Sequence, residues 1–135
     1  MPPFAISPLY AALCAILLIA LSLRVARLRK TLKVGIGDGG ERDLQKAIRV
    51  QGNFVEYVPL ALLLLFLLEL SRQAPFWALH LLGAGLLLGR VLHAIGLSST
   101  AGLSFGRLVG ITLTFAMILI TAVWLLVISV AGMAM

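Results

Sequence analysis

The residues of this chain whose types and spacing could do chemistry stand in one short stretch, residues 49–59. Its polar side chains recur at a spacing that places them within an arc of about 100° on one helix face. They are Arg49, Asn53, Glu56 and Tyr57. Gln51, in the same stretch, points the opposite way. The pattern predicts a one-sided polar surface on a helix.

Glu56 limits which face of this helix can point towards lipid. It lies about 10 Å along the helix axis from Arg49, in a segment that continues into a long apolar run. An unpaired carboxylate in hydrocarbon costs roughly 2.5 kcal/mol or more. Two alternatives follow: an Arg49–Glu56 pair that only joins helices, or a polar site that faces the interior of a helix bundle. Pro59 favours an irregular helix here because it frees the Val55 carbonyl.

Further basic side chains are expected near the same end of the other helices. These candidates are Arg27, Arg90, His93 and Arg107. Arg90 could instead be an anchor that extends to the membrane surface, and His93 a packing residue. Arginine forks suit carboxylates, and Glu56 could hold an amine. We therefore expect a site for a peptide-like zwitterion with two carboxylates, with an apolar second substrate arriving from lipid. We expect no metal, because no second His or Cys stands at ligand spacing.

The elements that must position these side chains are four transmembrane helices in a single domain, residues 1–135. Hydrophobic residues make up 61% of the chain and charged residues 12%, about half the charge of a soluble domain. A spanning helix needs about 20 mostly apolar residues, and an open sheet cannot face lipid. The spans are expected at about residues 6–23, 50–70, 76–97 and 105–131. The fold class is an all-α membrane bundle.

Charge sets the expected orientation. Eight of the eleven Lys and Arg residues lie within residues 24–49, which we interpret as a basic loop between two spans rather than a nucleic-acid surface. Ten basic residues fall on the side of the first and third links, and only Arg72 falls on the other. The positive-inside rule then predicts a cytoplasmic basic loop and two periplasmic termini. Glu69 and Arg72, three residues apart at a helix end, are expected to lie at the interface on the far side.

The stretch from Arg49 to Pro59, Arg-x-Gln-x-Asn-x-x-Glu-Tyr-x-Pro, resembles the signature of the MAPEG superfamily, the membrane-associated proteins of eicosanoid and glutathione metabolism. The resemblance covers nearly the whole chain, with four spans, a basic first loop, and arginines in the third and fourth spans. Val34-Gly-Ile-Gly-Asp-Gly-Gly40 is similar to the bacterial branch. It implies a protein of the bacterial inner membrane.

The resemblance implies a homotrimer that binds glutathione, its co-substrate, between neighbouring subunits near the cytosolic face. It implies contacts to glutathione from Arg49, Asn53, Glu56, Tyr57 and Arg90, with Arg27 and Gln51 reaching in from the adjacent subunit. It also implies that Arg107 is catalytic and stabilises the glutathione thiolate. The chain carries His93 and Leu97 where eukaryotic members have aromatic residues on the third helix.

The expected function is therefore that of a glutathione transferase or peroxidase. A thiolate held by Arg107 would attack a lipophilic electrophile or reduce a hydroperoxide. One alternative is a non-enzymatic membrane protein of the same fold that binds lipid or glutathione. A small proton-coupled exporter is disfavoured, because it would need a membrane-embedded acid in the first span, and residues 1–23 contain none.

Overall fold

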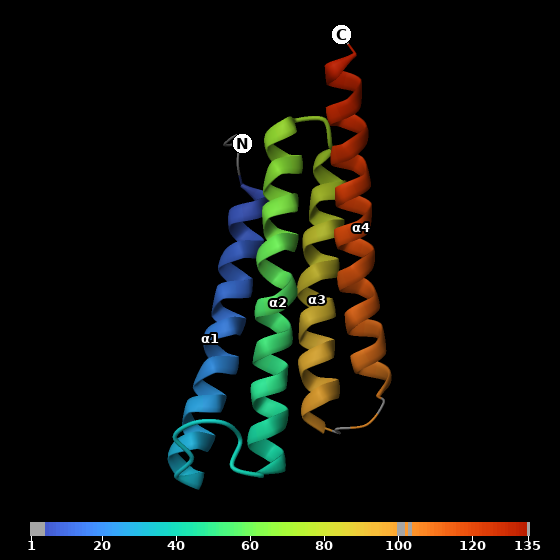
Figure 1. Cartoon of the computed structure of the whole chain (residues 1–135). Helices are drawn as coiled ribbons and strands as arrows, with labels where there is room; N and C mark the ends of the chain where they lie inside the picture. The colour runs from blue at the N-terminus through green and yellow to red at the C-terminus, as the bar shows by residue number, and fades with distance from the viewer. Residues whose placement is uncertain (1–4, 100–101, 103, 135) are drawn as a thin grey trace.

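The computed structural model describes residues 5–99, 102 and 104–134, and within them the chain forms four long helices (Figure 1). They are α1 (Ile6–Leu32), α2 (Arg42–Ser71), α3 (Phe76–Ser99) and α4 (Phe105–Met133). The shortest has 24 residues, or about 36 Å at 1.5 Å per residue, which exceeds the hydrocarbon thickness of a bilayer. All four are long and apolar enough to cross a membrane. The all-helical fold predicted from composition is confirmed.

The helices continue past the expected spans at the basic end of the molecule. The interval of residues 24–49, expected as one loop, is largely helical, because α1 runs to Leu32 and α2 already begins at Arg42. Only residues 33–41 connect them. The apolar runs define the lipid-embedded part, but a helix does not have to end where it leaves the hydrocarbon. The last turn of α1 also carries two basic residues, Arg29 and Lys30, whose positive charges interact favourably with the negative end of the helix dipole.

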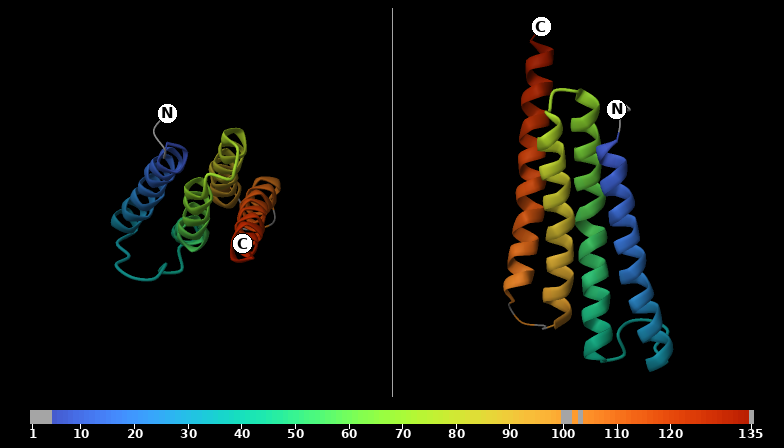
Figure 2. Two further views of the ribbon diagram at one scale, coloured as in Figure 1. Left: turned by 90° about the horizontal axis from the view of Figure 1, so that it is seen from above. Right: turned by 180° about the vertical axis from the view of Figure 1, so that it is seen from behind.

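The arrangement is an up-and-down bundle that is open on one side. Both termini lie at the same end, and α4 projects past the α2–α3 turn (Figure 1). Among the described residues, α1 contacts α2 and α3 but not α4. Figure 2, seen from above, shows α1 and α4 on opposite sides of the central pair. The helices α2 and α3 therefore form the centre of the protomer.

Apolar side chains fill the centre and also cover the outside. Ala61, Leu65 and Leu86 are fully buried in the main core. Large apolar residues are exposed on the outer faces of all four helices, including Ile16 at 69% and Leu119 at 65%. A surface of this kind is stable only when lipid covers it. The protein is an integral membrane protein.

Glu69 stabilises the end of the bundle opposite the basic loop. Its carboxylate accepts hydrogen bonds from the backbone amides of Ala5 (3.0 Å), Ile6 (2.9 Å) and Ser7 (2.8 Å), and from the Ser7 hydroxyl. These amides begin α1 and have no partner within their own helix. Glu69 and Arg72 lie at the end of α2, where they were expected, and neither of the two ion pairs found within the described residues includes them.

Helices α3 and α4 approach closely through glycines. A Cβ at Gly110 would lie 2.7 Å from the Cβ of His93 and closer still to backbone atoms of Gly89 and His93. A Cβ at Gly106 would lie 3.0 Å from the carbonyl oxygen of Leu92. Small residues let membrane helices pack backbone to backbone. This contact determines where the start of α4 lies relative to α3.

The close contact predicts a large effect from adding one methyl group. Gly110→Ala should lower the free energy of unfolding by about 1–3 kcal/mol, because the rigid backbone of α3 cannot move aside. Gly85→Ala is the matched control on α3, since a Cβ added there would meet nothing within 4 Å, and it should be neutral or slightly stabilising. Thermal unfolding of both variants in detergent measures this. Equal midpoints would contradict the tight contact.

Candidate functional site

The Arg49–Glu56 ion pair forms as the spacing on α2 predicts. The guanidinium Nη1 of Arg49 lies 3.1 Å from the Oε1 of Glu56. Both side chains are about half exposed, at 59% and 47%. For these two side chains the expectation of an interior-facing site is wrong in the single chain, because both are too exposed to lie between helices. The pair lies on the protomer surface.

One pocket does gather predicted site residues from three helices. Its volume is about 230 Å³. It is lined by Asn53, Tyr57, His93, Ser104, Arg107, Leu108 and Ile111. Four of the nine predicted site residues therefore meet in one cavity at the basic end of the bundle. Asn53 lies one turn from both Arg49 and Glu56 on α2, which places the ion pair beside the pocket.

The start of α4 is held in place so that Arg107 lines this pocket. The Ser104 hydroxyl accepts a hydrogen bond from the Arg107 backbone amide (3.3 Å) and caps the helix. Ser104 and the Arg107 amide pack directly against Gly96 of α3, where a Cβ would collide with both. Sequence reasoning missed Ser104. The signal was a serine directly before an apolar helix start, which is typical of an N-cap.

On the α2 side of the pocket, one side chain is packed against α4 and one polar atom lacks a hydrogen bond. The Tyr57 ring packs edge-to-face against Phe115 of α4, with centroids 5.2 Å apart. The Oδ1 atom of Asn53 is buried and has no hydrogen-bond partner within the described chain. A buried acceptor without a partner costs about 1–3 kcal/mol. A donor from a bound molecule would relieve that cost.

Arg90 lies deeper than the pocket and is not among the residues that line it. Its side chain is only 1% exposed, so the alternative that it is a surface anchor is wrong. Two of its donors, Nε and Nη1, are buried without a partner among the described residues. His93, one turn further along α3, is also buried. The pocket therefore borders a buried positive charge that the described chain leaves uncompensated.

Gln51 and Arg27 lie away from the pocket on the α1 side of the protomer. The Nε2 of Gln51 donates to the Ser22 hydroxyl of α1 (3.1 Å). Arg27 is exposed and lines a different cavity with Arg24 and Asp43. A single chain does not bring these two residues to Arg107. Their expected role in an adjacent subunit's site stays a prediction.

Comparison with known proteins agrees with the architecture. The model of the MAPEG family matches residues 7–127. The chain is similar to inner membrane protein YecN of Escherichia coli K12, with 46% identity over 91 residues that cover 67% of this chain and 69% of the relative. The YecN protein of E. coli O6:H1 strain CFT073 matches to the same extent. The four apolar helices and these relatives together support an integral protein of the inner membrane.

The unpartnered donors of Arg90 predict that its charge does not stabilise the ligand-free protein. Arg90→Met keeps most of the side-chain length and removes the desolvated charge, so it should leave the thermal midpoint unchanged or raise it. Leu86→Ala on the same helix should lose about 2–5 kcal/mol and shows that the assay senses the core. If Arg90→Met lost as much as Leu86→Ala, the guanidinium would have a structural partner in the ligand-free state.

Proposed function

The chain belongs to the MAPEG family, and from this premise we propose that it is a glutathione-dependent transferase or peroxidase of the membrane. The observation that carries the proposal is the pocket in which Arg107 of α4 meets Tyr57 and Asn53 of α2. The Arg49–Glu56 pair lies beside it. These groups match what glutathione offers: two carboxylates, an amine and a thiol.

Binding would use the polar atoms that the described chain leaves unsatisfied. The acceptor of Asn53 lines the pocket and suits an amide donor of a tripeptide. The donors of Arg90, one turn of α3 from His93, suit a carboxylate that reaches past the pocket lining. Arg49 and Glu56, half exposed at the rim, suit a carboxylate and an amine. In a homotrimer, Arg27 and Gln51 of a neighbouring subunit would complete the site. The trimer is part of the proposal.

Arg107 would then activate the thiol. A free thiol has a pKa of about 8.5 and is only a few per cent thiolate at neutral pH. Lowering that pKa by about two units requires roughly 2.7 kcal/mol. One guanidinium at about 4 Å supplies roughly 4 kcal/mol at an effective dielectric constant of about 20, before desolvation. A single well-placed arginine is sufficient.

The activated thiolate can react in two ways. It can attack an electrophilic carbon of a lipophilic substrate, forming a carbon–sulfur bond as the leaving group departs. It can also take the terminal oxygen of a hydroperoxide, giving an alcohol and a sulfenic acid, which a second glutathione converts to a disulfide and water. Both substrates partition into lipid, so they would reach the pocket from the membrane. The proposed orientation places the basic end, and glutathione, in the cytoplasm.

The pocket of a single chain is small for a tripeptide. Ligand pockets usually enclose about 300–1,000 Å³, and the volume here is about 230 Å³. Binding of glutathione would therefore need a neighbouring subunit to enlarge the site. A second candidate function is the binding of a lipid or glutathione without catalysis, because the relatives are named only as inner membrane proteins. The two candidates differ in turnover, since only the first consumes glutathione.

Arg107→Ala should lower the rate of glutathione conjugation to chlorodinitrobenzene by about tenfold or more, because the bound thiol returns towards its ordinary ionisation. Arg107→Lys should keep part of the rate, since it keeps the charge. Lys30→Ala removes an exposed charge of α1 that lines none of the described pockets, and it should retain the full rate. Full activity of Arg107→Ala would remove this residue from the mechanism.

Glutathione should also stabilise the folded protein. A ligand at 100 times its Kd adds about 2.7 kcal/mol to the free energy of unfolding, and thermal unfolding in detergent measures the shift. Glu56→Gln should weaken this stabilisation while changing the ligand-free midpoint little, because the ion pair that it breaks is half exposed. Stabilisation without turnover would support the binding function. The absence of any stabilisation by glutathione would contradict both the enzyme and a glutathione-binding protein, and would leave lipid binding as the function.

A further inference from the structure

The largest of the cavities described here lies between α1 and α3, on the open side of the bundle. Its volume is about 500 Å³. It is lined by Leu17, Leu21, Arg24, Val91, Ala94, Ile95, Ser98 and Ser99. Along each helix these residues recur at spacings of three or four, so each forms a continuous stripe. The walls are apolar along their length and become polar at the basic end. We refer to this cavity as the α1–α3 groove.

The α1–α3 groove is separate from the candidate thiol site. The two cavities share no lining residue. On α3, Val91 and His93 are two positions apart, about 200° around the helix, so the groove and the thiol pocket lie on opposite faces. The α4 helix, which supplies Arg107, does not contact α1 within the described chain. Nothing in the proposed chemistry uses this groove.

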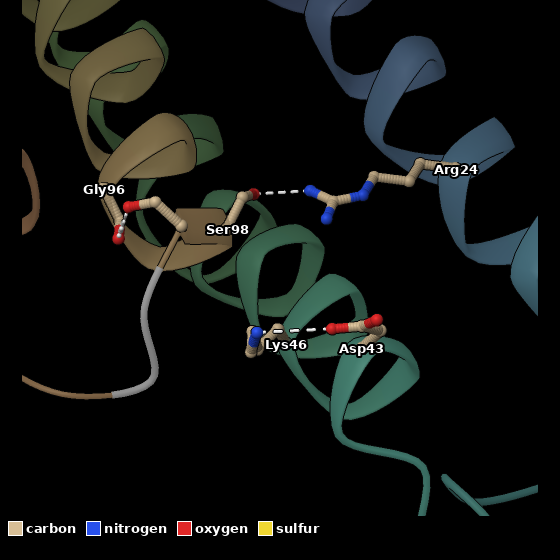
Figure 3. Close-up of polar contacts among 6 residues, drawn as sticks. Arg24, Asp43, Lys46, Gly96 and Ser98 are labelled. Atoms are coloured by element: carbon tan, nitrogen blue, oxygen red, sulfur yellow. Dashed lines mark hydrogen bonds and ion pairs between the residues drawn. The ribbon is translucent and has the colours of Figure 1, made fainter.

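Arg24 closes the basic end of the groove and carries an uncompensated charge. Its Nη1 donates to the hydroxyl of Ser98 across the groove (Figure 3). Ser98 is neutral, so this contact orients the guanidinium without balancing its charge. Ser99 is turned back to its own helix, donating to the Gly96 carbonyl at 2.9 Å. Neither of the two ion pairs within the described residues includes Arg24.

A second cavity adjoins the first at Arg24 and is basic overall. Its volume is about 380 Å³, and it is lined by Ala20, Arg24, Arg27, Leu28 and Asp43. Asp43, its one acid, already pairs with Lys46 at 3.2 Å (Figure 3). Two guanidinium groups, those of Arg24 and Arg27, therefore border a polar space directly below an apolar groove.

We propose that the α1–α3 groove binds an anionic phospholipid of the surrounding bilayer. An acyl chain would lie along Leu17, Leu21 and Val91, and the headgroup phosphate would bind the Arg24 guanidinium at the polar end of the groove. Guanidinium forks bind phosphate oxygens in pairs, and the apolar walls exclude a small soluble anion. The site is apolar along the part that lies in the membrane and cationic at its basic end. This arrangement matches a lipid with apolar chains and an anionic headgroup.

Native mass spectrometry of the detergent-solubilised protein, titrated with phosphatidylglycerol, tests the proposal. Wild-type protein should retain phosphatidylglycerol in preference to phosphatidylcholine. Arg24→Gln should weaken phosphatidylglycerol binding about tenfold, as expected for the loss of a charged hydrogen-bonding group. Val91→Trp should fill the groove and also abolish binding. Lys30→Gln removes a charge from the same helix outside the groove and should bind as wild type does.

Several outcomes would overturn the assignment. Equal retention of the two lipids, or equal losses in Arg24→Gln and Lys30→Gln, would mean that only general surface charge attracts lipid. Retention of oleate but not of phosphatidylglycerol would mean that the site takes a free fatty acid. Loss of binding counts only for a folded variant, so each thermal midpoint is measured. Should Val91→Trp fail to fold, Ile95→Trp, at an exposed groove position, replaces it, and undiminished binding there would also overturn the proposal.

Discussion

A guanidinium group surrounded by apolar helices loses its hydration and must find anions or acceptors in the protein or in a ligand. Arg90, at 1% exposure, meets that constraint only in part, because two of its donors have no partner within the described chain. The Oδ1 acceptor of Asn53, which lines the pocket, is in the same state. The helices therefore hold polar atoms in a low-dielectric interior where a bound polar molecule would satisfy them. We consider this unsatisfied polarity the physical basis of the proposed site.

The rest of the bundle holds that polarity in position. Close glycine contacts between α3 and α4, together with the Ser104 cap, place Arg107 beside His93 and Tyr57. At the opposite end, Glu69 joins the start of α1 to the end of α2. Between these two ends, α1 contacts α2 and α3, and an open groove remains between α1 and α3. The protomer thus has a tightly packed α3–α4 side that carries the Arg107 pocket and a looser α1–α3 side with an open groove.

Much of the fold could be predicted because a bilayer allows few solutions. Four apolar runs required four helices, and the spacing of Arg49 and Glu56 placed them on one helix face. Contacts between distant residues could not be predicted. Glu69 binds amides 62 to 64 positions away, and Gln51 binds Ser22, neither of which leaves a local pattern. The exposure of the Arg49–Glu56 pair was missed because spacing shows which residues share a face but not what covers it.

The central claim is that a positive cradle ionises a bound thiol, and ultraviolet difference spectroscopy tests it directly. Glutathione is added to the detergent-solubilised protein at neutral pH, and the absorbance of the thiolate is followed. We expect a thiolate band with the wild-type protein that is absent from Arg107→Ala although glutathione still binds. A wild-type protein that binds glutathione without a thiolate band, or an equal band in both proteins, would contradict the account.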